Sequence, residues 1–482
     1  MENRIQKFMT WCKLFLLKTK SKEAARFLKT KTPLFIKKWL SAKIFKEEIE
    51  EANRIYFLLK ELDYDVFSKN KSYLIRNFQI KKILDIMHYA YEFCPYYREA
   101  FNRYNININN INDFYRIPLL DKEIIRKEKE RLISKNLYKI KFTLLNTGGS
   151  TGEPLEFLVS YSAGYIDYIH QKFIFEKMGY KKGDKIVAFD GSTVPSFLRK
   201  KNIYWITKSN NDLPYGRLSY SSLYLNRDTI KYYVDHFLKF RPSILRGYPS
   251  FINEIAEYII EKDINIPFII KGIQLTAECA FDFQIKNIEK AFKTRVFLQY
   301  GHSEQCVYAY TKDNTYEYYC SPFYGLVEVL DPHGKQVRKG EIGEIVATSF
   351  YNTAMPFIRY KTGDLAWFEG NENGIVKIKK IEGRTQDFVY RKNGEKISIT
   401  AIVFGQHYRA FRNIKKWQIV QNKMGEITIN IIKGENFSKD DELEIINKFR
   451  NIAGIEVRLN FVDRIELTKR GKFRFVIVDL KP

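Results

Sequence analysis

Glycines interleaved with hydroxyl residues form the stretch of this chain best suited to chemistry. It runs Asn146-Thr147-Gly148-Gly149-Ser150-Thr151-Gly152-Glu153-Pro154-Leu155 between two apolar segments. Glycine lets successive backbone N–H groups turn toward one anion, and Ser and Thr hydroxyls add further donors. The phosphate motifs G-x-x-x-x-G-K-[ST] and G-x-G-x-x-G are absent. We therefore predict a loop that wraps the polyphosphate of a nucleotide; the alternative is a glycine-rich surface turn.

Three more motifs follow in order along the chain. They are Tyr300-Gly301-His302-Ser303-Glu304, Tyr360-Lys361-Thr362-Gly363-Asp364 and Leu467-Thr468-Lys469-Arg470-Gly471-Lys472-Phe473-Arg474. With the glycine-rich loop, they resemble the core motifs of the adenylate-forming (AMP-binding) enzymes, the superfamily of acyl-CoA ligases, peptide-synthetase adenylation domains and luciferases.

The resemblance extends into one branch of that superfamily. Phe93-Cys94-Pro95-Tyr96-Tyr97-Arg98, followed by Ile117-Pro118-Leu119-Leu120-Asp121-Lys122-Glu123, is similar to the N-terminal signature of phenylacetate–CoA ligases and coenzyme F390 synthetases. Leu245-Arg246-Gly247-Tyr248-Pro249-Ser250 and Gly471-Lys472-Phe473-Arg474-Phe475-Val476 are most similar to CapK-type members linked to capsular polysaccharide genes. The resemblance covers the chain from about residue 80 to its end.

Composition agrees with a folded enzyme and weakens other classes. The chain has 482 residues, of which 45% are hydrophobic, enough for one large and one small domain. Its 81 Lys and Arg against 56 Asp and Glu give a net charge of +25. This excess is spread over a chain rich in Lys, Ile and Asn, so we do not expect a nucleic-acid partner. The five cysteines lack C-x-x-C spacing, which favours a reducing, cytoplasmic compartment without disulfides.

The N-terminal segment lies outside the resemblance. Apolar residues alternate with lysines around Trp11 and again around Trp39, which predicts two basic amphipathic helices. The apolar runs are shorter than the ~18 residues that a membrane-spanning helix needs. Two interpretations stay open: these helices lie on the inner face of a membrane as a peripheral anchor, or they pack on the large domain or on a second subunit.

Alternating helical and strand patterns predict a mixed α/β fold. Residues 72–93 are expected to form a helix, and residues 186–190, 243–246 and 270–275 to form buried strands. From Tyr324 the pattern changes to β segments separated by Gly, Asp and Asn turns. We place a basic helical extension at 1–70, a large multi-layer AMP-binding domain at 71–386 with a β-rich subdomain from about 324, and a small mobile α+β domain at 387–482.

The resemblance also implies roles for individual residues. The β- and γ-phosphates of ATP would lie against Thr147, Gly148, Gly149, Ser150, Thr151 and Gly152. The rest of the nucleotide would lie against Ala277, Glu278, Tyr300, Gly301, His302, Ser303 and Asp364, and Arg384 would contact the ribose or a phosphate. Glu304 would hold Mg²⁺, and Asp364 would accept hydrogen bonds from both ribose hydroxyls. Leu155 stands where many superfamily members have Lys, so phosphate neutralisation depends on Mg²⁺ and other cations.

Two positions near the C-terminus carry the expected mechanism. Lys472 matches the catalytic lysine, which bridges the attacking carboxylate and the α-phosphate in the transition state. Asp387 matches the hinge about which the small domain rotates between two half-reactions. A pocket facing Asp190, Gly191, Ser192, Tyr248 and Pro249 is expected to select the acid, and its composition permits an aryl, hydroxy or uronic acid.

The cysteines raise the question of a structural zinc site, separate from the expected Mg²⁺ site. Cys279, His302, Cys306 and Cys320 fall near one another in the expected fold, and some relatives of this branch carry a structural zinc there. The spacing is not that of a closed zinc site, and His302 belongs to a nucleotide motif. Isolated buried cysteines are therefore the favoured interpretation.

The function expected from these observations is ATP-dependent activation of a small carboxylic acid. The acyl-adenylate would form with release of pyrophosphate, and the acyl group would pass to an acceptor in capsular or surface polysaccharide biosynthesis. Coenzyme A and a sugar or amino group both stay open as the acceptor. The alternatives are an acyl-CoA ligase for a small aryl or hydroxy acid and a non-catalytic scaffold of a membrane-associated polysaccharide assembly.

Overall fold

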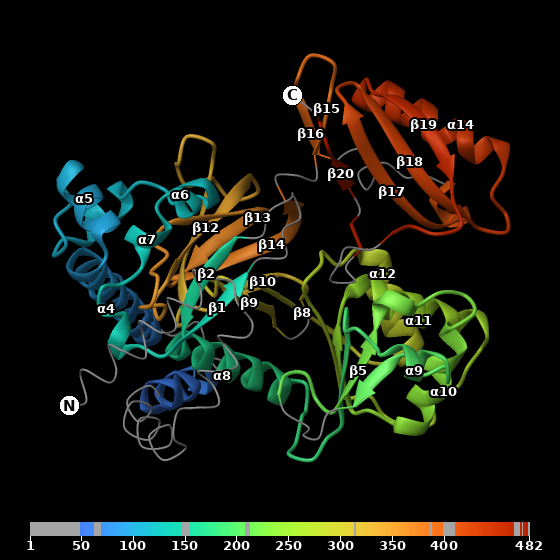
Figure 1. The fold of residues 1–482 in the computed structure, drawn as a ribbon, viewed down its shortest axis with the longest axis horizontal. Helices are drawn as coiled ribbons and strands as arrows, with labels where there is room; N and C mark the ends of the chain where they lie inside the picture. Colours follow the sequence, from blue (N-terminus) through green and yellow to red (C-terminus); the bar gives the residue numbers. More distant parts are fainter. Residues whose placement is uncertain are drawn as a thin grey trace.

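A computed structural model describes residues 49–61, 69–146, 155–207, 213–312, 315–384, 388–398, 410–466, 473–474 and 476–480. Buried hydrophobic side chains in these ranges form two separate main cores. One extends from Ala52 to Ile381, and the other from Val389 to Val476. The predicted mixed α/β class, with a large domain and a smaller C-terminal one, is confirmed (Figure 1).

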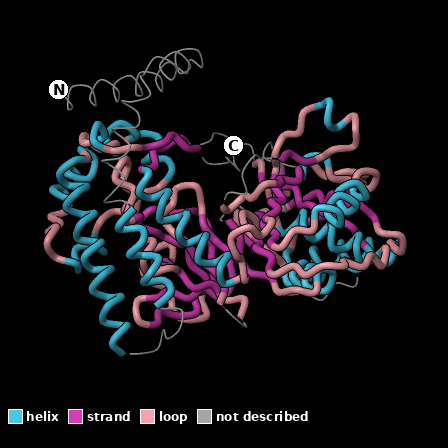
Figure 2. Tube along the Cα trace, turned by 90° about the horizontal axis from the view of Figure 1, so that it is seen from below, coloured by secondary structure: helices cyan, strands magenta, loops and turns pink. Residues whose placement is uncertain are grey.

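Helices form one side of the large domain (Figures 1 and 2). Their bounds are residues 49–61, α4 Lys69–Phe93, α5 Pro95–Arg103, α6 Lys122–Lys127 and α7 Lys129–Leu132. Ala52, Ile55 and Leu59 of the first of these helices are buried in the large core. The described part of the predicted N-terminal extension therefore packs on the large domain. The two basic amphipathic helices expected before it lie outside the described residues.

One mixed sheet of twelve strands runs through the large domain in the order β11-β12-β13-β14-β10-β9-β8-β7-β6-β3-β5-β4. Its first strands along the chain are β3 Ile186–Asp190, β4 Trp205–Thr207, β5 Leu218–Ser221, β6 Ile244–Gly247, β7 Gly272–Leu275 and β8 Val296–Gly301. They are followed by β9 Tyr308–Thr311, β10 Tyr318–Cys320, β11 Gly325–Leu330, β12 Ile342–Ser349, β13 Tyr360–Glu372 and β14 Ile375–Arg384. The strands expected from about residue 324 therefore continue the same sheet.

The parallel half of this sheet consists of β5, β3, β6, β7 and β8. Helices α8 Tyr161–Lys177, α9 Ser196–Arg199, α10 Ile230–Phe240, α11 Pro249–Glu261 and α12 Asp282–Phe292 lie in this part of the chain. Residues 186–189 are all buried, as is typical of a parallel strand covered on both faces. The chain adds β5 on one side of β3 and then β6 on the other. The carboxyl ends of β3 and β6 are therefore a topological switch point, where ligands bind in open α/β sheets.

The sheet changes from parallel to antiparallel at β8. This strand pairs in parallel with β7 and antiparallel with β9. Ahead of the sheet, β1 Phe142–Asn146 and β2 Glu156–Ser160 form an antiparallel hairpin in which Asn146 pairs with Glu156. The glycine-rich loop Thr147–Gly152 connects these two strands and lies outside the described residues.

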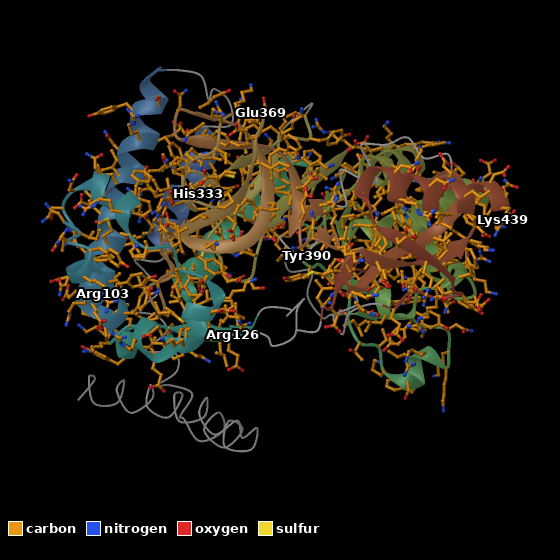
Figure 3. The ribbon with its side chains drawn as sticks, turned by 90° about the horizontal axis from the view of Figure 1, so that it is seen from above. Arg103, Arg126, His333, Glu369, Tyr390 and Lys439 are labelled. Atoms are coloured by element: carbon orange, nitrogen blue, oxygen red, sulfur yellow. The ribbon has the colours of Figure 1, made fainter. Side chains whose placement is uncertain are left out.

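The C-terminal domain is a small sheet in the order β19-β18-β17-β20, accompanied by a helix. Its elements are β15 Phe388–Tyr390, β16 Lys396–Ser398, β17 Ile414–Lys423, β18 Glu426–Lys433, α14 Lys439–Lys448, β19 Glu456–Phe461 and β20 Val476–Val478. Strand β18 alternates buried residues with partly or fully exposed ones, which fits a sheet covered on one face. Figure 3 shows Tyr390 near the middle of the view, with Arg103 and Lys439 toward opposite ends of the molecule.

Candidate active site

The Tyr-Gly-His-Ser-Glu motif forms the end of β8 and the turn that follows it. Glu304 is 5% exposed, and the Tyr360 hydroxyl donates a hydrogen bond to its Oε1 at 2.7 Å. Burial opposes ionisation of this carboxyl group, but nearby His302 and the bond from Tyr360 outweigh burial and lower its pKa to about 2. Glu304 is therefore a buried carboxylate that stays ionised at neutral pH.

The Tyr-Lys-Thr-Gly-Asp motif opens β13 beside this turn. The Tyr300 hydroxyl donates to Asp364 Oδ2 at 2.8 Å, and the Asp364 amide donates to Thr362 Oγ1 at 3.1 Å. Burial, together with the negative charge of Asp364, raises the pKa of Tyr300 well above its usual range, so the hydroxyl remains a donor. Two tyrosine–carboxylate hydrogen bonds thus join the two motifs, one through Glu304 and one through Asp364.

His302 lies against Glu304 inside this cluster. Its Nδ1 atom is 3.2 Å from Glu304 Oε2, too poorly aligned to count as a hydrogen bond. Both ring nitrogens are buried and have no hydrogen-bond partner within the described part of the chain. The imidazole also meets the rings of Tyr300 and Tyr360 edge-on. His302 therefore contributes polar atoms that the described residues do not satisfy.

Glu304 meets the requirements for holding Mg²⁺. Mg²⁺ is commonly bound by one or two carboxylates together with phosphate oxygens and water. An ionised carboxylate offers about four lone-pair sites, so the bond from Tyr360 and the nearby His302 leave room for a further partner. No group of three or more His, Cys, Asp or Glu among the described residues could form an all-protein metal site. Of the described cysteines, Cys306 and Cys320 are buried and Cys279 is partly buried, and none of the three is in a disulfide within the described residues.

Glu278 connects the two domains. Its Oε2 atom accepts from the backbone N–H of Ser250, in the first turn of α11, at 3.2 Å, where the helix dipole favours a negative charge. Its Oε1 atom accepts from the backbone N–H of Phe473 at 3.0 Å. Lys416 on β17 also forms an ion pair with Glu254 on α11. The C-terminal domain therefore contacts the large domain one residue away from Lys472, which lies outside the described residues.

The expected acid pocket begins at the switch point. Asp190 Oδ1 accepts from the Ser192 amide at 2.9 Å, and Oδ2 accepts from the Ser219 hydroxyl at 2.7 Å. Burial, together with the negative charges of Asp190 and Glu278, raises the pKa of Tyr248 to about 12. Gly247 sits beside β3 so closely that a Cβ there would lie 2.3 Å from the Phe189 carbonyl oxygen. Glycine therefore lets β6 pack against β3 at this edge.

The remaining predicted site residues fall at the same edge or outside the described residues. Gly191 and Ser192 follow β3, Pro249 begins α11, and Ala277 follows β7 with a φ of +69°. Gly301 and Ser303 flank His302, and Arg384 pairs with Asp364 in the β13–β14 register. The loop Thr147–Gly152, the hinge Asp387 and Lys472 are not described. The roles given to all of these residues stay predictions.

Tyr360 has a role that its motif did not reveal. Its hydroxyl holds Glu304, and the two residues are 56 positions apart. The one signal in the sequence was that Tyr360 begins a motif that ends in a carboxylate, Asp364. Nothing comparable pointed to the buried polar residues Gln171 and Gln274, which share a hydrogen bond between α8 and β7.

Comparison with known proteins supports the expected relationship. The family model described as the CapK C-terminal domain matches residues 389–479. The chain is 29% identical over 422 residues to Protein CapK of Staphylococcus aureus, with 84% of this chain and 89% of that protein covered. It is 24% identical over 336 residues to a phenylacetate-coenzyme A ligase of Pseudomonas putida, covering 65% and 72% of the two proteins.

Solved structures show the same fold. The crystal structure of 2-hydroxyisobutyryl-CoA ligase in the postadenylation state, with R3-HIB-AMP, matches with a TM-score of 0.62 and 18% identity, covering 83% of this chain and 89% of that chain. No helix in the described ranges is both long and apolar enough to cross a membrane. The predicted superfamily, branch, fold and ligase class are confirmed: the chain is a relative of the adenylate-forming ligases, on the branch that holds CapK and the phenylacetate–CoA ligases.

Proposed function

We propose that the chain activates a carboxylic acid with ATP, forms an acyl-adenylate, releases pyrophosphate, and then transfers the acyl group to an acceptor. The observation that carries this proposal is the pairing of the two motifs at the end of β8. Glu304 and Asp364 are each fixed there by a tyrosine hydroxyl, at 2.7 and 2.8 Å. A scaffold without catalysis would not require this arrangement of buried carboxylates.

The reaction brings two anions together, since a carboxylate attacks the α-phosphate of ATP. A site for it must neutralise charge and hold both substrates in line. Glu304 is 5% exposed and would hold Mg²⁺ against the phosphates; the metal would supply charge neutralisation there. Tyr300 fixes the Asp364 carboxylate, which would accept hydrogen bonds from the ribose. Arg384 pairs with Asp364 in the β13–β14 register, and we assign it a contact with the ribose or a phosphate of the same nucleotide.

The transition state requires a cation near the α-phosphate, and we assign this role to Lys472. The bond from Phe473 N to Glu278 Oε1 at 3.0 Å supports the assignment, because it anchors the neighbouring residue to the edge that holds Tyr248 and Glu304. A lysine delivered by the small domain acts only when the domains close, so it gates adenylation. Rotation about Asp387 would then expose the adenylate to the acceptor.

We propose that the acceptor reaction belongs to capsular or surface polysaccharide assembly, with a sugar or amino group as acceptor. The similarity to Protein CapK along 84% of this chain supports this choice. Transfer to coenzyme A is the second candidate, favoured by the similarity to a phenylacetate-coenzyme A ligase. We expect the protein to act in the cytoplasm, where ATP is present.

A pyrophosphate-release assay over a panel of carboxylic acids, with and without coenzyme A, tests the proposal. We expect acid-dependent release that requires Mg²⁺. A thioester product in the presence of coenzyme A would identify the second candidate as the acceptor. Absence of release with every acid, from protein that still binds ATP, would contradict the function.

A further inference from the structure

A buried hydrogen-bonded cluster joins α8 to the parallel half of the sheet. Gln274 on β7 is fully buried, and its Oε1 atom accepts from Arg246 Nε at 3.0 Å and from Gln171 Nε2 at 2.9 Å. The Tyr308 hydroxyl on β9 donates to Gln171 Oε1 at 3.1 Å. Polar side chains therefore meet at a helix–sheet interface that is usually filled by apolar ones.

The Gln274 amide is oriented by this network. Two donors face Oε1, so turning the amide around would place its NH₂ group against them. In this fixed orientation Nε2 is buried and makes no hydrogen bond of ordinary geometry among the described residues, although the Tyr308 hydroxyl lies beside it. A buried donor without an acceptor costs free energy. This donor therefore remains available to an acceptor oxygen from outside the described chain.

Arg246 and Asp167 complete the cluster and are both only partly buried. The described residues give Arg246 one hydrogen bond, from Nε, and its guanidinium lies 5.0 Å from the centre of the Tyr215 ring. Asp167 Oδ1 accepts from the Tyr324 hydroxyl at 3.0 Å. The cluster thus combines a cation, an amide donor and a carboxylate acceptor, which together suit a ligand that carries hydroxyl groups.

Strand register connects this cluster to the expected acid pocket. Arg246 pairs with Ala188 on one side and with Gln274 on the other, so all three share one face of the sheet. Asp190 lies two residues beyond Ala188 on that same face, at the carboxyl end of β3. Two residues of strand span about 6.6 Å. An acid activated at the strand ends would reach Arg246 and Gln274 with its distal atoms.

We propose that Arg246 and Gln274 bind oxygen atoms on the tail of the activated acid, and that this acid is a hydroxylated carboxylic acid. The inference rests on the proposed function and narrows its substrate. A hydrocarbon or phenyl tail would exclude water from the guanidinium and the amide without replacing the hydrogen bonds that water makes to them. Sites with buried polar groups reject ligands that leave those groups unpaired.

Gluconate and hexanoate, which share a carbon skeleton and differ in their hydroxyls, are the matched probes, with glucuronate and phenylacetate as a second pair. In acid-dependent ATP–pyrophosphate exchange we expect the hydroxylated member of each pair to have a kcat/KM at least about tenfold higher. Arg246→Met and Gln274→Met should remove most of this preference by lowering kcat/KM for the hydroxylated acid alone. Arg338→Met, at a side chain that is 89% exposed, is the matched control and should change nothing.

Unchanged affinity for ATP checks that each variant is folded, and Arg246→Lys replaces Arg246→Met if the latter is not. Exchange that favours hexanoate or phenylacetate would overturn the inference and leave the proposed function intact. The inference would likewise be overturned if both variants kept the preference of the parent protein. Exchange with none of these acids, from protein that binds ATP, would count against both the inference and the proposed function.

Discussion

Glu278 offers the sharpest test of how the two domains cooperate. Glu278→Ala removes the acceptor for two backbone N–H groups, one in the large domain at Ser250 and one at Phe473 beside Lys472. A hydrogen bond to a charged group contributes about 1.5–3 kcal/mol, which corresponds to about 10- to 150-fold. Glu278 is only half-buried, so water weakens the bond and we expect the lower end, about tenfold.

The expected loss is confined to adenylation. Acid-dependent ATP–pyrophosphate exchange should fall about tenfold in Glu278→Ala, while turnover of a preformed acyl-adenylate should stay near that of the parent. Glu278 is also expected to lie against the nucleotide, so titration calorimetry separates its two roles: if the domain contact is the main one, the affinity for Mg-ATP stays unchanged. Glu261→Gln, at the exposed end of α11, the helix whose first turn contains Ser250, is the matched control. If affinity for Mg-ATP falls as much as exchange does, Glu278 binds the nucleotide and the domain contact is not its main role.

Three further changes test the site and its support. Glu304→Gln should suppress exchange at all Mg²⁺ concentrations. The pKa of Glu304 is about 2 in the folded protein, below the ordinary 4.5, so the ionised group stabilises the fold above about pH 4.5. The difference in unfolding free energy between parent and variant, up to about 3 kcal/mol, should shrink as pH falls toward 2. A difference that does not change with pH would contradict this. Asp364→Ala should weaken ATP binding by about 2 kcal/mol and abolish discrimination against deoxyribose nucleotide; retained discrimination would exclude the ribose role. Arg359→Met leaves Glu328 buried without its partner and should lower the free energy of unfolding by about 3–5 kcal/mol in denaturant titrations, with exposed Arg338→Met as the control; a loss below about 1 kcal/mol would refute it.

Much of the fold could be predicted from local patterns. The expected strand at residues 186–190 is β3 with the same bounds, and the expected helix 72–93 lies within α4. Apolar runs between turn residues are a local signal, so the elements predicted from them do not depend on contacts with distant parts of the chain. The expected strand at 270–275 begins later, at Gly272, since β7 starts only where it pairs with Ile244 of β6. That boundary depends on a neighbour that a local pattern does not contain.

The site could be predicted at the level of motifs but not of contacts. Motif order alone places Tyr300, Glu304 and Asp364 in one site. The partner of Glu304 is Tyr360, and this pairing depends on how β8 and β13 are spaced within one sheet. The Gln274 network was missed for a related reason. Glutamines carry no spacing signal, and their role follows from the contact of α8 with β7.

The central claim is that the chain forms an acyl-adenylate, and isotope exchange measures that step without requiring the acceptor. Purified protein should incorporate radiolabelled pyrophosphate into ATP only when both its acid and Mg²⁺ are present, and Lys472→Ala should lose this exchange while still binding ATP. Exchange that needs no acid, or a Lys472→Ala variant that exchanges as fast as the parent, would contradict the account.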